Sequence, residues 1–222
     1  MNLGKLIVML RAFVSGAPLA DVVLLKLDAL SSPPAETERA LEPFAGFVPK
    51  HDLAELRALP RGTLGRAYAS FLDDNRITPL EPSAAMRARF AKRPYPLRYA
   101  ATHDLHHVIT GFDTSLAGEL GVAAFNVGQR DAPVGFAGLV LAGVIYSIVT
   151  PWRVRRIWRN FRLGLRAGRA ADLVIAAPLE SWFADSLESV RARLRVSAPS
   201  ARASAGAGSA AALPVSALSD RS

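Results

Sequence analysis

Residues 103–119 read HDLHHVITGFDTSLAGE, and this stretch decides both the predicted fold and the predicted site. On a helix, residues four apart lie on the same face, about one turn from each other. His103 and His107 have this spacing, which allows two helical histidines to share one metal ion. Asp104 lies about 100° around the helix from His103, so it can reach the same ion or orient one of its ligands.

The second half of this stretch predicts a turn and a second helix. Gly111 is the residue type that most often ends a helix, and Thr114 or Ser115 can cap the helix that follows. A short link of this kind produces an antiparallel helical hairpin. Glu119 would then lie in the early turns of the second helix, at the same end of the hairpin as His107.

These residues form a candidate site for a divalent metal. The chain has no cysteine, so a metal would be held by nitrogen and oxygen ligands alone. Two imidazoles and one or two carboxylates suit Zn²⁺ or Fe²⁺, and suit Mn²⁺ less well. The alternative is an ordinary polar helix face, which the spacing by itself leaves equally open. The candidate ligands are His103, Asp104, His107 and Glu119, and Asp104 is also the candidate catalytic residue.

Two further histidines are assigned other positions. His106 lies beside the ligand pair in sequence but points elsewhere on the helix, so it is interpreted as a bystander or as a group that contacts a ligand. His51 stands alone in the sequence and is interpreted as a surface residue.

The rest of the chain predicts an all-α fold. Apolar residues recur at helical spacing, and no stretch alternates with the two-residue period of a strand. Prolines at 79, 82, 94 and 96 predict a loop-rich stretch between two helical regions. The expected helices fall within residues 3–30 (as two helices broken near residues 16–18), 52–59, 63–75, 83–91, the 103–119 hairpin and further segments up to residue 196.

Composition divides the chain into two parts. Residues 1–196 are expected to form a single helical domain. Residues 197–222 are mostly alanine, serine, glycine and proline, a composition that buries too little apolar surface to offset the cost of ordering, so a disordered tail is expected. A cleaved signal peptide is not expected, because Arg11 interrupts the short apolar run near the N-terminus.

Two neighbouring segments bear on membrane contact. Residues 133–152 hold no charged side chain, which permits a membrane-spanning helix or a buried or lipid-contacting one. Residues 152–169 form a basic amphipathic helix, with an apolar stripe that includes Ile157 and Phe161 and with arginines on the other side. Such a helix either lies on an anionic membrane or packs its stripe inward. The net charge of +8 favours an anionic partner, but nucleic acid is not expected because no recognition motif accompanies the arginines.

Several blocks of the sequence resemble one known family. The pattern H-D-x-x-H, eleven residues and then E is similar to the signature of the coenzyme Q (ubiquinone) biosynthesis protein 4 homolog family. Three other stretches resemble family blocks in the same order. They are Leu59-Pro60-Arg61-Gly62-Thr63-Leu64-Gly65-Arg66-Ala67-Tyr68 with the following Asn75-Arg76, then Gly168-Arg169-Ala170-Ala171-Asp172-Leu173, and residues 179–194.

The resemblance covers roughly residues 50–196 and implies a set of properties. It implies an all-helical fold, a bound divalent metal usually taken as zinc, and attachment to a membrane surface. It also implies a role in ubiquinone synthesis, namely C1 decarboxylation of a polyprenylated 4-hydroxy-3-methoxybenzoate, with His103, Asp104, His107 and Glu119 as metal ligands. The arginine- and alanine-rich composition suggests a bacterial member, which would be peripheral on the cytoplasmic side of the inner membrane.

Three functions remain open at this point. The first is a metal-dependent decarboxylase, a carbon–carbon lyase acting on a prenylated aromatic acid. The second is a non-catalytic scaffold or lipid-binding protein that organises ubiquinone-biosynthesis enzymes. The third is a metal-dependent hydrolase of another lipid. The expected partners are a prenylated aromatic or quinone lipid, the membrane surface, other enzymes of the pathway and a second copy of the chain.

Overall fold

The structure is a computed structural model that describes residues 3–31, 33–129 and 135–198. Within these residues the fold is all-α, as predicted, and the only pairing of strand type is an isolated bridge between Thr63 and Ser186. Nearly all of the expected tail, residues 199–222, lies outside the described residues, so its disorder and the domain boundary at 196 stay predictions.

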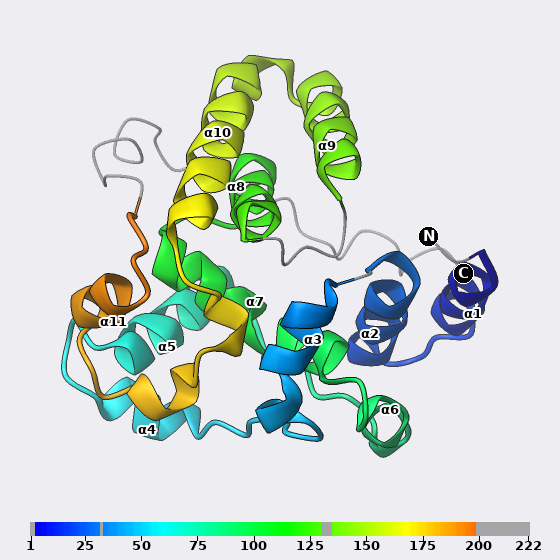
Figure 1. Ribbon diagram of the computed structural model, residues 1–222, viewed down its shortest axis with the longest axis horizontal. Helices are drawn as coiled ribbons and strands as arrows, with labels where there is room; N and C mark the ends of the chain where they lie inside the picture. The colour runs from blue at the N-terminus through cyan, green and yellow to red at the C-terminus, as the bar shows by residue number, and fades with distance from the viewer. Residues whose placement is uncertain (1–2, 32, 130–134, 199–222) are drawn as a thin grey trace, which may run out of the picture.

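Eleven α-helices make up the described part of the chain. Figure 1 shows α8, α9 and α10 forming one layer, which stands over a second layer that contains α4, α5, α7 and α11. The helix α1 lies at the far edge of this second layer, next to α2. The helices are α1 (Leu3–Val14), α2 (Leu19–Leu30), α3 (Ala35–Ala40), α4 (Leu53–Ala58), α5 (Leu64–Asn75), α6 (Ala84–Phe90), α7 (Pro94–Thr110), α8 (Leu116–Gly128), α9 (Phe136–Val149), α10 (Val154–Ala170) and α11 (Leu187–Arg193).

The helices α8 and α10 pack closely against each other within the upper layer. Glycines make this approach possible, because a Cβ atom on Gly164 would lie 2.1 Å from the Gly121 carbonyl oxygen. A Cβ atom on Gly168 would lie 2.0 Å from the carbonyl oxygen of Phe125. The stripe of α10 therefore packs inward, with Ile157 fully buried, and this favours the packed interpretation of the amphipathic helix over the interfacial one.

The helix α7 crosses the lower layer and is fixed by a buried arginine. Arg98 is almost completely inaccessible, and its guanidinium lies over the Phe44 ring. It donates through Nε to the Ile175 carbonyl at 2.9 Å and through Nη2 to the Ala177 carbonyl at 2.5 Å, and it pairs with Glu180. A buried arginine is tolerated only with partners of this kind, so Arg98 locks α7 against the 173–182 segment.

Most predicted helix ends are confirmed. Thr63 and Ser83 cap α5 and α6 with their side chains, and Asp52 caps α4. The prediction of a loop at Pro94 and Pro96 was wrong, because both residues lie in the first turn of α7. Proline has no N–H to leave unpaired there, and its fixed φ suits a helix start. Residues 179–194, one of the blocks that resemble the family, form a 3₁₀ turn at Leu179–Trp182 followed by the short helix α11.

The apolar span forms a largely exposed helix, so of the three alternatives left open for it the buried core helix does not hold. The helix α9 starts at Phe136, and Leu139 and Gly143 are its only buried residues. Ile148 is 74% exposed and Trp152, after the helix end, is 76% exposed, so α9 is not a buried core helix. No single described helix is long and apolar enough to cross a membrane. The pair formed by α9 and the segment Pro151–Ala170 reaches that length only with a 118° bend.

The glycine contact between α8 and α10 gives a stability prediction. Gly168→Ala should lower the free energy of unfolding by roughly 1–3 kcal/mol, because the new methyl group meets backbone that cannot move aside. The matched control is Gly135→Ala, where a Cβ atom would have no neighbour within 4 Å. Thermal unfolding of the two variants measures the difference. Equal melting temperatures would contradict the close packing of the two helices.

Candidate metal centre

Three of the four predicted ligands, His103, His107 and Glu119, converge where α7 turns into α8. His103 and His107 lie one turn apart on α7, with ring centroids 5.0 Å apart and ring planes nearly perpendicular. Gly111 ends the helix in the left-handed conformation at φ 76°, as predicted. Ser115, rather than Thr114, caps α8 and accepts a hydrogen bond from Gly118 N–H. The turn brings the first turn of α8 back over the end of α7.

Glu119 bridges the two imidazoles. Its Oε1 lies 3.3 Å from His107 Nε2, and its Oε2 lies 3.5 Å from His103 Nε2. The side chain of His107 is 1% exposed, whereas those of His103 and Glu119 are about one third exposed. The cluster is therefore buried on one side and open on the other, the arrangement that a catalytic metal site requires.

The second nitrogen of His107 fixes its tautomer. Nδ1 lies 3.1 Å from the Phe112 carbonyl oxygen, which can only accept a hydrogen bond, so Nδ1 carries the proton. In a neutral ring this leaves the lone pair on Nε2, the atom that faces Glu119. The ring also stacks on Phe71 of α5 at 5.4 Å, which holds its orientation. Metal-ligating histidines are commonly oriented by a carbonyl in this way.

These residues fit a divalent metal on the structure's own geometry. One ligand atom each from His103, His107 and Glu119 can be chosen so that all lie within 4.8 Å of one another. Around a tetrahedral ion with ligand bonds of about 2.1 Å, two ligand atoms are separated by roughly 3.4 Å. Each imidazole is near this separation from one oxygen of Glu119, His107 Nε2 from Oε1 at 3.3 Å and His103 Nε2 from Oε2 at 3.5 Å.

The charge states of Glu119 and His107 depend on each other. Burial raises the pKa of Glu119, but hydrogen bonds from His103 and His107 outweigh it and lower that pKa to about 2. Burial lowers the pKa of His107, but the partner Glu119 outweighs it and raises the pKa above its usual value. Without a metal, therefore, the carboxylate stays ionised and the imidazole tends to hold a proton.

Asp104 lies beside the cluster but outside the group of three. It lines the cavity described below together with His103 and Glu119. Burial raises the pKa of Asp104, the two ligand histidines lower it, Glu119 raises it further, and the net shift is upward. A carboxyl group in such surroundings retains a proton more readily than an ordinary aspartate, which suits a proton carrier better than a ligand.

The two remaining histidines differ from each other. His106 is fully buried, and burial lowers its pKa to about 3, so it stays neutral outside the ligand group. The surface assignment of His51 was wrong. Its ring packs edge-on against Phe183 at 4.9 Å, its Nε2 is buried, and the residue lines a small cavity together with Asp104. The contact joins residues far apart in the chain, so the local sequence carried no signal for it.

A large cavity opens beside the cluster. Its volume is about 790 Å³, and its walls come from α2, α7, α8, α9 and the chain that follows α5. The lining is mostly apolar, with His103, Asp104 and Glu119 on one wall and Tyr146 of α9 among the other polar residues. Ligand-binding sites in proteins combine an apolar enclosure of this size with a few convergent polar groups.

Fold and site together define a class of protein: an all-helical chain with a metal-capable cluster on the wall of an apolar cavity. The chain belongs to the Coenzyme Q (ubiquinone) biosynthesis protein Coq4 family, whose model matches residues 48–200. Those residues include the cluster, α8, α9 and α10, and they leave out α1 and α2.

Curated relatives agree with this assignment. The chain is 31% identical over 150 residues to the mitochondrial ubiquinone biosynthesis protein COQ4 homolog of Danio rerio, covering 67% of this chain and 54% of that protein. It is 31% identical over 158 residues to the human homolog, covering 67% of this chain and 56% of that one. The chain thus spans about half the length of the curated relatives it matches.

A solved structure supports the fold independently. A crystal structure from Nostoc punctiforme, of a protein described as a candidate ubiquinone biosynthesis protein, matches with a TM-score of 0.60. The match covers 86% of this chain and 95% of the other at 23% sequence identity, so it bears on the fold alone.

Removing one ligand tests the site directly. His107→Ala should abolish stoichiometric metal binding. The helical content should stay close to that of the unaltered protein, because the helices are held together by their apolar core and not by the metal. His51→Ala, a histidine outside the cluster, is the control and should retain the metal. Elemental analysis of the purified proteins measures both. Metal content equal to the unaltered protein in His107→Ala would refute the assignment.

The shifted pKa values predict opposite pH effects with and without metal. In metal-free protein, the raised pKa of His107 gives stability that is present below about pH 6.5 and lost as the pH rises through the folded value. The lowered pKa of Glu119 gives stability that is present above about pH 4.5 and lost as the pH falls towards about 2.

Metal binding needs a neutral imidazole, so it should strengthen as the pH rises. The rise in melting temperature on adding zinc should be larger at about pH 8 than at about pH 5.5. Differential scanning fluorimetry measures the melting temperature with and without zinc at both pH values. In the control His107→Ala, zinc should raise the melting temperature at neither pH. A zinc effect independent of pH would contradict coordination by these histidines.

Proposed function

We propose that the protein acts in ubiquinone biosynthesis, as an enzyme that removes the C1 carboxylate of a polyprenylated 4-hydroxy-3-methoxybenzoate. One observation carries the proposal. The ligand group of His103, His107 and Glu119 lies on the wall of an apolar cavity of about 790 Å³. Membership of the Coq4 family supports the same pathway.

The cavity suits an aromatic acid with an isoprenoid chain. Its apolar walls can enclose a prenyl chain, while the polar wall faces the aromatic head group. Tyr99, on α7, accepts a hydrogen bond from Asn126 Nδ2 at 3.1 Å, so its ring is held in place one turn before His103. The Tyr99 ring stacks on His103 at 5.8 Å and extends the flat, apolar surface around the site.

The reaction breaks one bond and consumes one proton. The bond between the ring carbon and the carboxyl carbon breaks, carbon dioxide leaves, and the ring carbon receives a proton in place of the carboxylate. A divalent metal, when bound, would supply Lewis-acid stabilisation of negative charge on a substrate oxygen. Asp104 would deliver the proton, because it lines the cavity beside the cluster.

Activity separates this function from lipid binding alone. The unaltered protein with metal should release carbon dioxide from the prenylated hydroxybenzoate. Asp104→Asn should lose most of this activity, by roughly two to four orders of magnitude, while retaining the metal. His107→Ala should lose both the activity and the metal. Carbon dioxide release and metal content are measured on the same samples. Tight binding of the substrate without turnover in the unaltered protein would favour the non-catalytic alternative.

We also propose that the corner between α9 and α10 contacts a membrane surface. Ile148, Val149 and Trp152 are exposed large apolar side chains at this corner. The described part of the following helix carries several arginines and no acidic residue. A tryptophan at an apolar edge next to a basic helix is the arrangement found at membrane interfaces.

Vesicle flotation tests this surface. Replacing Arg155, Arg159 and Arg162 together with glutamine should weaken binding to anionic vesicles by roughly two orders of magnitude at low salt, since each arginine contributes about 1 kcal/mol. Binding to neutral vesicles should not change, and the effect should shrink as salt rises. Trp152→Ser should weaken binding to both kinds of vesicle. Unchanged flotation of both variants would exclude this corner as the membrane contact.

A further inference from the structure

The large cavity has two cations on its wall as well as the metal-capable cluster. Lys26 of α2 and Arg76, which follows α5, both line it, and both are exposed. Within the described residues, neither side chain forms an ion pair or a hydrogen bond with another protein group. Leu19, another exposed lining residue, lies on α2 with Lys26, so these residues mark the cavity's opening to solvent.

Arg76 occupies a backbone position that an arginine rarely adopts. Its φ is 54°, in the left-handed region. The Ile77 N–H donates to the Leu72 carbonyl and the Arg76 N–H to the Asp73 carbonyl, the hydrogen-bond pattern with which many helices end. Glycine is the usual residue at this position because it has no Cβ atom to strain. The helix end by itself gives no reason for an arginine here.

The backbone around Arg76 is held in place by contacts with the α7–α8 turn and with His107. Asn75 Oδ1 accepts a hydrogen bond from the Thr114 hydroxyl at 2.8 Å, which ties the end of α5 to the α7–α8 turn. Phe71, one turn earlier on α5, stacks on His107. The segment that carries the Arg76 side chain is therefore fixed relative to the cluster.

The charges on the cavity wall point to an anionic ligand. Asp104 and Glu119 face the cavity at the cluster, and Lys26 and Arg76 face it elsewhere. A divalent metal at the cluster would offset the two carboxylates and leave the two cations uncompensated. Unpaired cations at the mouth of an apolar cavity attract a ligand that combines an acidic group with an apolar body.

We propose that Lys26 and Arg76 determine specificity by attracting the anionic group of an amphiphilic ligand as it enters, so that the cavity accepts acids in preference to neutral molecules of the same shape. This inference rests on the proposed function and deepens it. The proposed substrate carries a carboxylate that its product lacks. A cavity that prefers the acid therefore binds the substrate more tightly than the product and favours product release.

Retinoic acid and retinol are suitable probes, because they share an isoprenoid body and differ in the charge of one end. Retinoid fluorescence gives both dissociation constants in the full chain. The unaltered protein should bind retinoic acid more tightly than retinol. Arg76→Gln and Lys26→Gln should each reduce this preference about fivefold, the effect of losing about 1 kcal/mol of a partly exposed ion pair, and should leave retinol binding unchanged.

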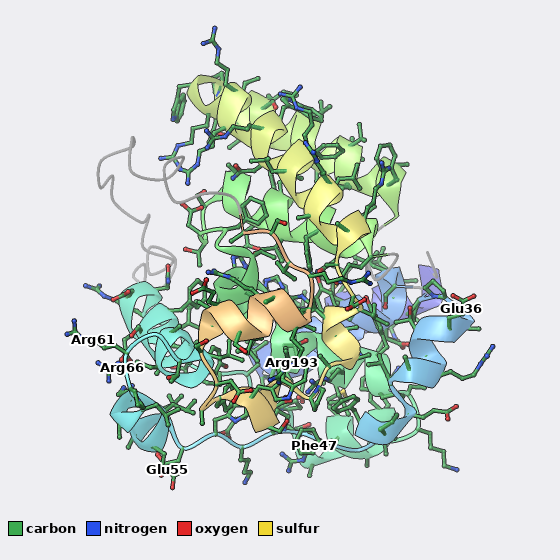
Figure 2. All side chains as sticks on the ribbon, turned by 60° about the vertical axis from the view of Figure 1, so that its left-hand side comes forward. Glu36, Phe47, Glu55, Arg61, Arg66 and Arg193 are labelled. Atoms are coloured by element: carbon green, nitrogen blue, oxygen red, sulfur yellow. The ribbon has the colours of Figure 1, made fainter. Side chains whose placement is uncertain are left out.

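Two further variants separate specificity from stability. Arg76→Gly removes the cation and also relieves the backbone, so it should unfold at the same or a higher temperature and still lose the preference for the acid. Arg61→Gln is the matched control. Figure 2 shows Arg61 and Arg66 extending outward at the edge of the molecule near α4 and α5, and Arg61 does not line the cavity. Its loss should leave the preference as it is.

Chelation distinguishes this inference from the proposed metal chemistry. If the cations bind the acid, protein treated with a chelator keeps a preference for retinoic acid, and the Arg76 variants lose it. If chelation removes the preference and Arg76→Gln keeps it, the metal alone binds the acid; the inference is then overturned while the proposed function stands. Equal binding of both retinoids by the unaltered protein would also overturn it, and failure to bind either would overturn the inference together with the proposed lipid cavity.

Discussion

The reversal of the chain at Gly111 is the constraint on which the site depends. Gly111 adopts φ 76° and ends α7 one turn after His107. The Phe112 carbonyl then accepts the hydrogen bond from His107 Nδ1, and the Phe112 ring packs so closely on α8 that a Cβ atom at Gly121 would lie 2.7 Å from it. A longer helix would carry Glu119 away from both imidazoles. One glycine conformation thus places the ligands and sets the tautomer.

The helix α8 connects the site to everything else. Its first turn supplies Glu119, its glycines allow α10 to approach closely, and Leu120 lines the cavity. The upper layer therefore serves two purposes. The helix α8 completes the metal-capable cluster, whereas α9 lines the cavity and leaves several of its own apolar side chains exposed. A membrane contact at α9 would lie on the same layer as the cavity wall, which suits a substrate that is taken from a lipid phase.

The sequence predicted what is local and missed what is distant. His103, His107 and Glu119 lie within seventeen residues, so helix periodicity and one glycine cap were enough to bring them together. The cavity could not be predicted, because its walls join α2 to α9 across more than a hundred residues and no short pattern encodes that pairing. The packing of His51 against Phe183 escaped prediction for the same reason. Asp104 was correctly placed near the cluster, and whether it is a ligand or a proton carrier stays a prediction.

The most direct test of the central claim is X-ray absorption spectroscopy of the metal-loaded protein. Two imidazole nitrogens and at least one carboxylate oxygen are expected in the coordination shell, at about 2.0–2.2 Å for zinc. His103→Ala and His107→Ala should each remove one imidazole from the fitted shell. A shell of oxygen ligands alone, or an imidazole count unaffected by either substitution, would contradict the assignment of the metal to the α7–α8 turn.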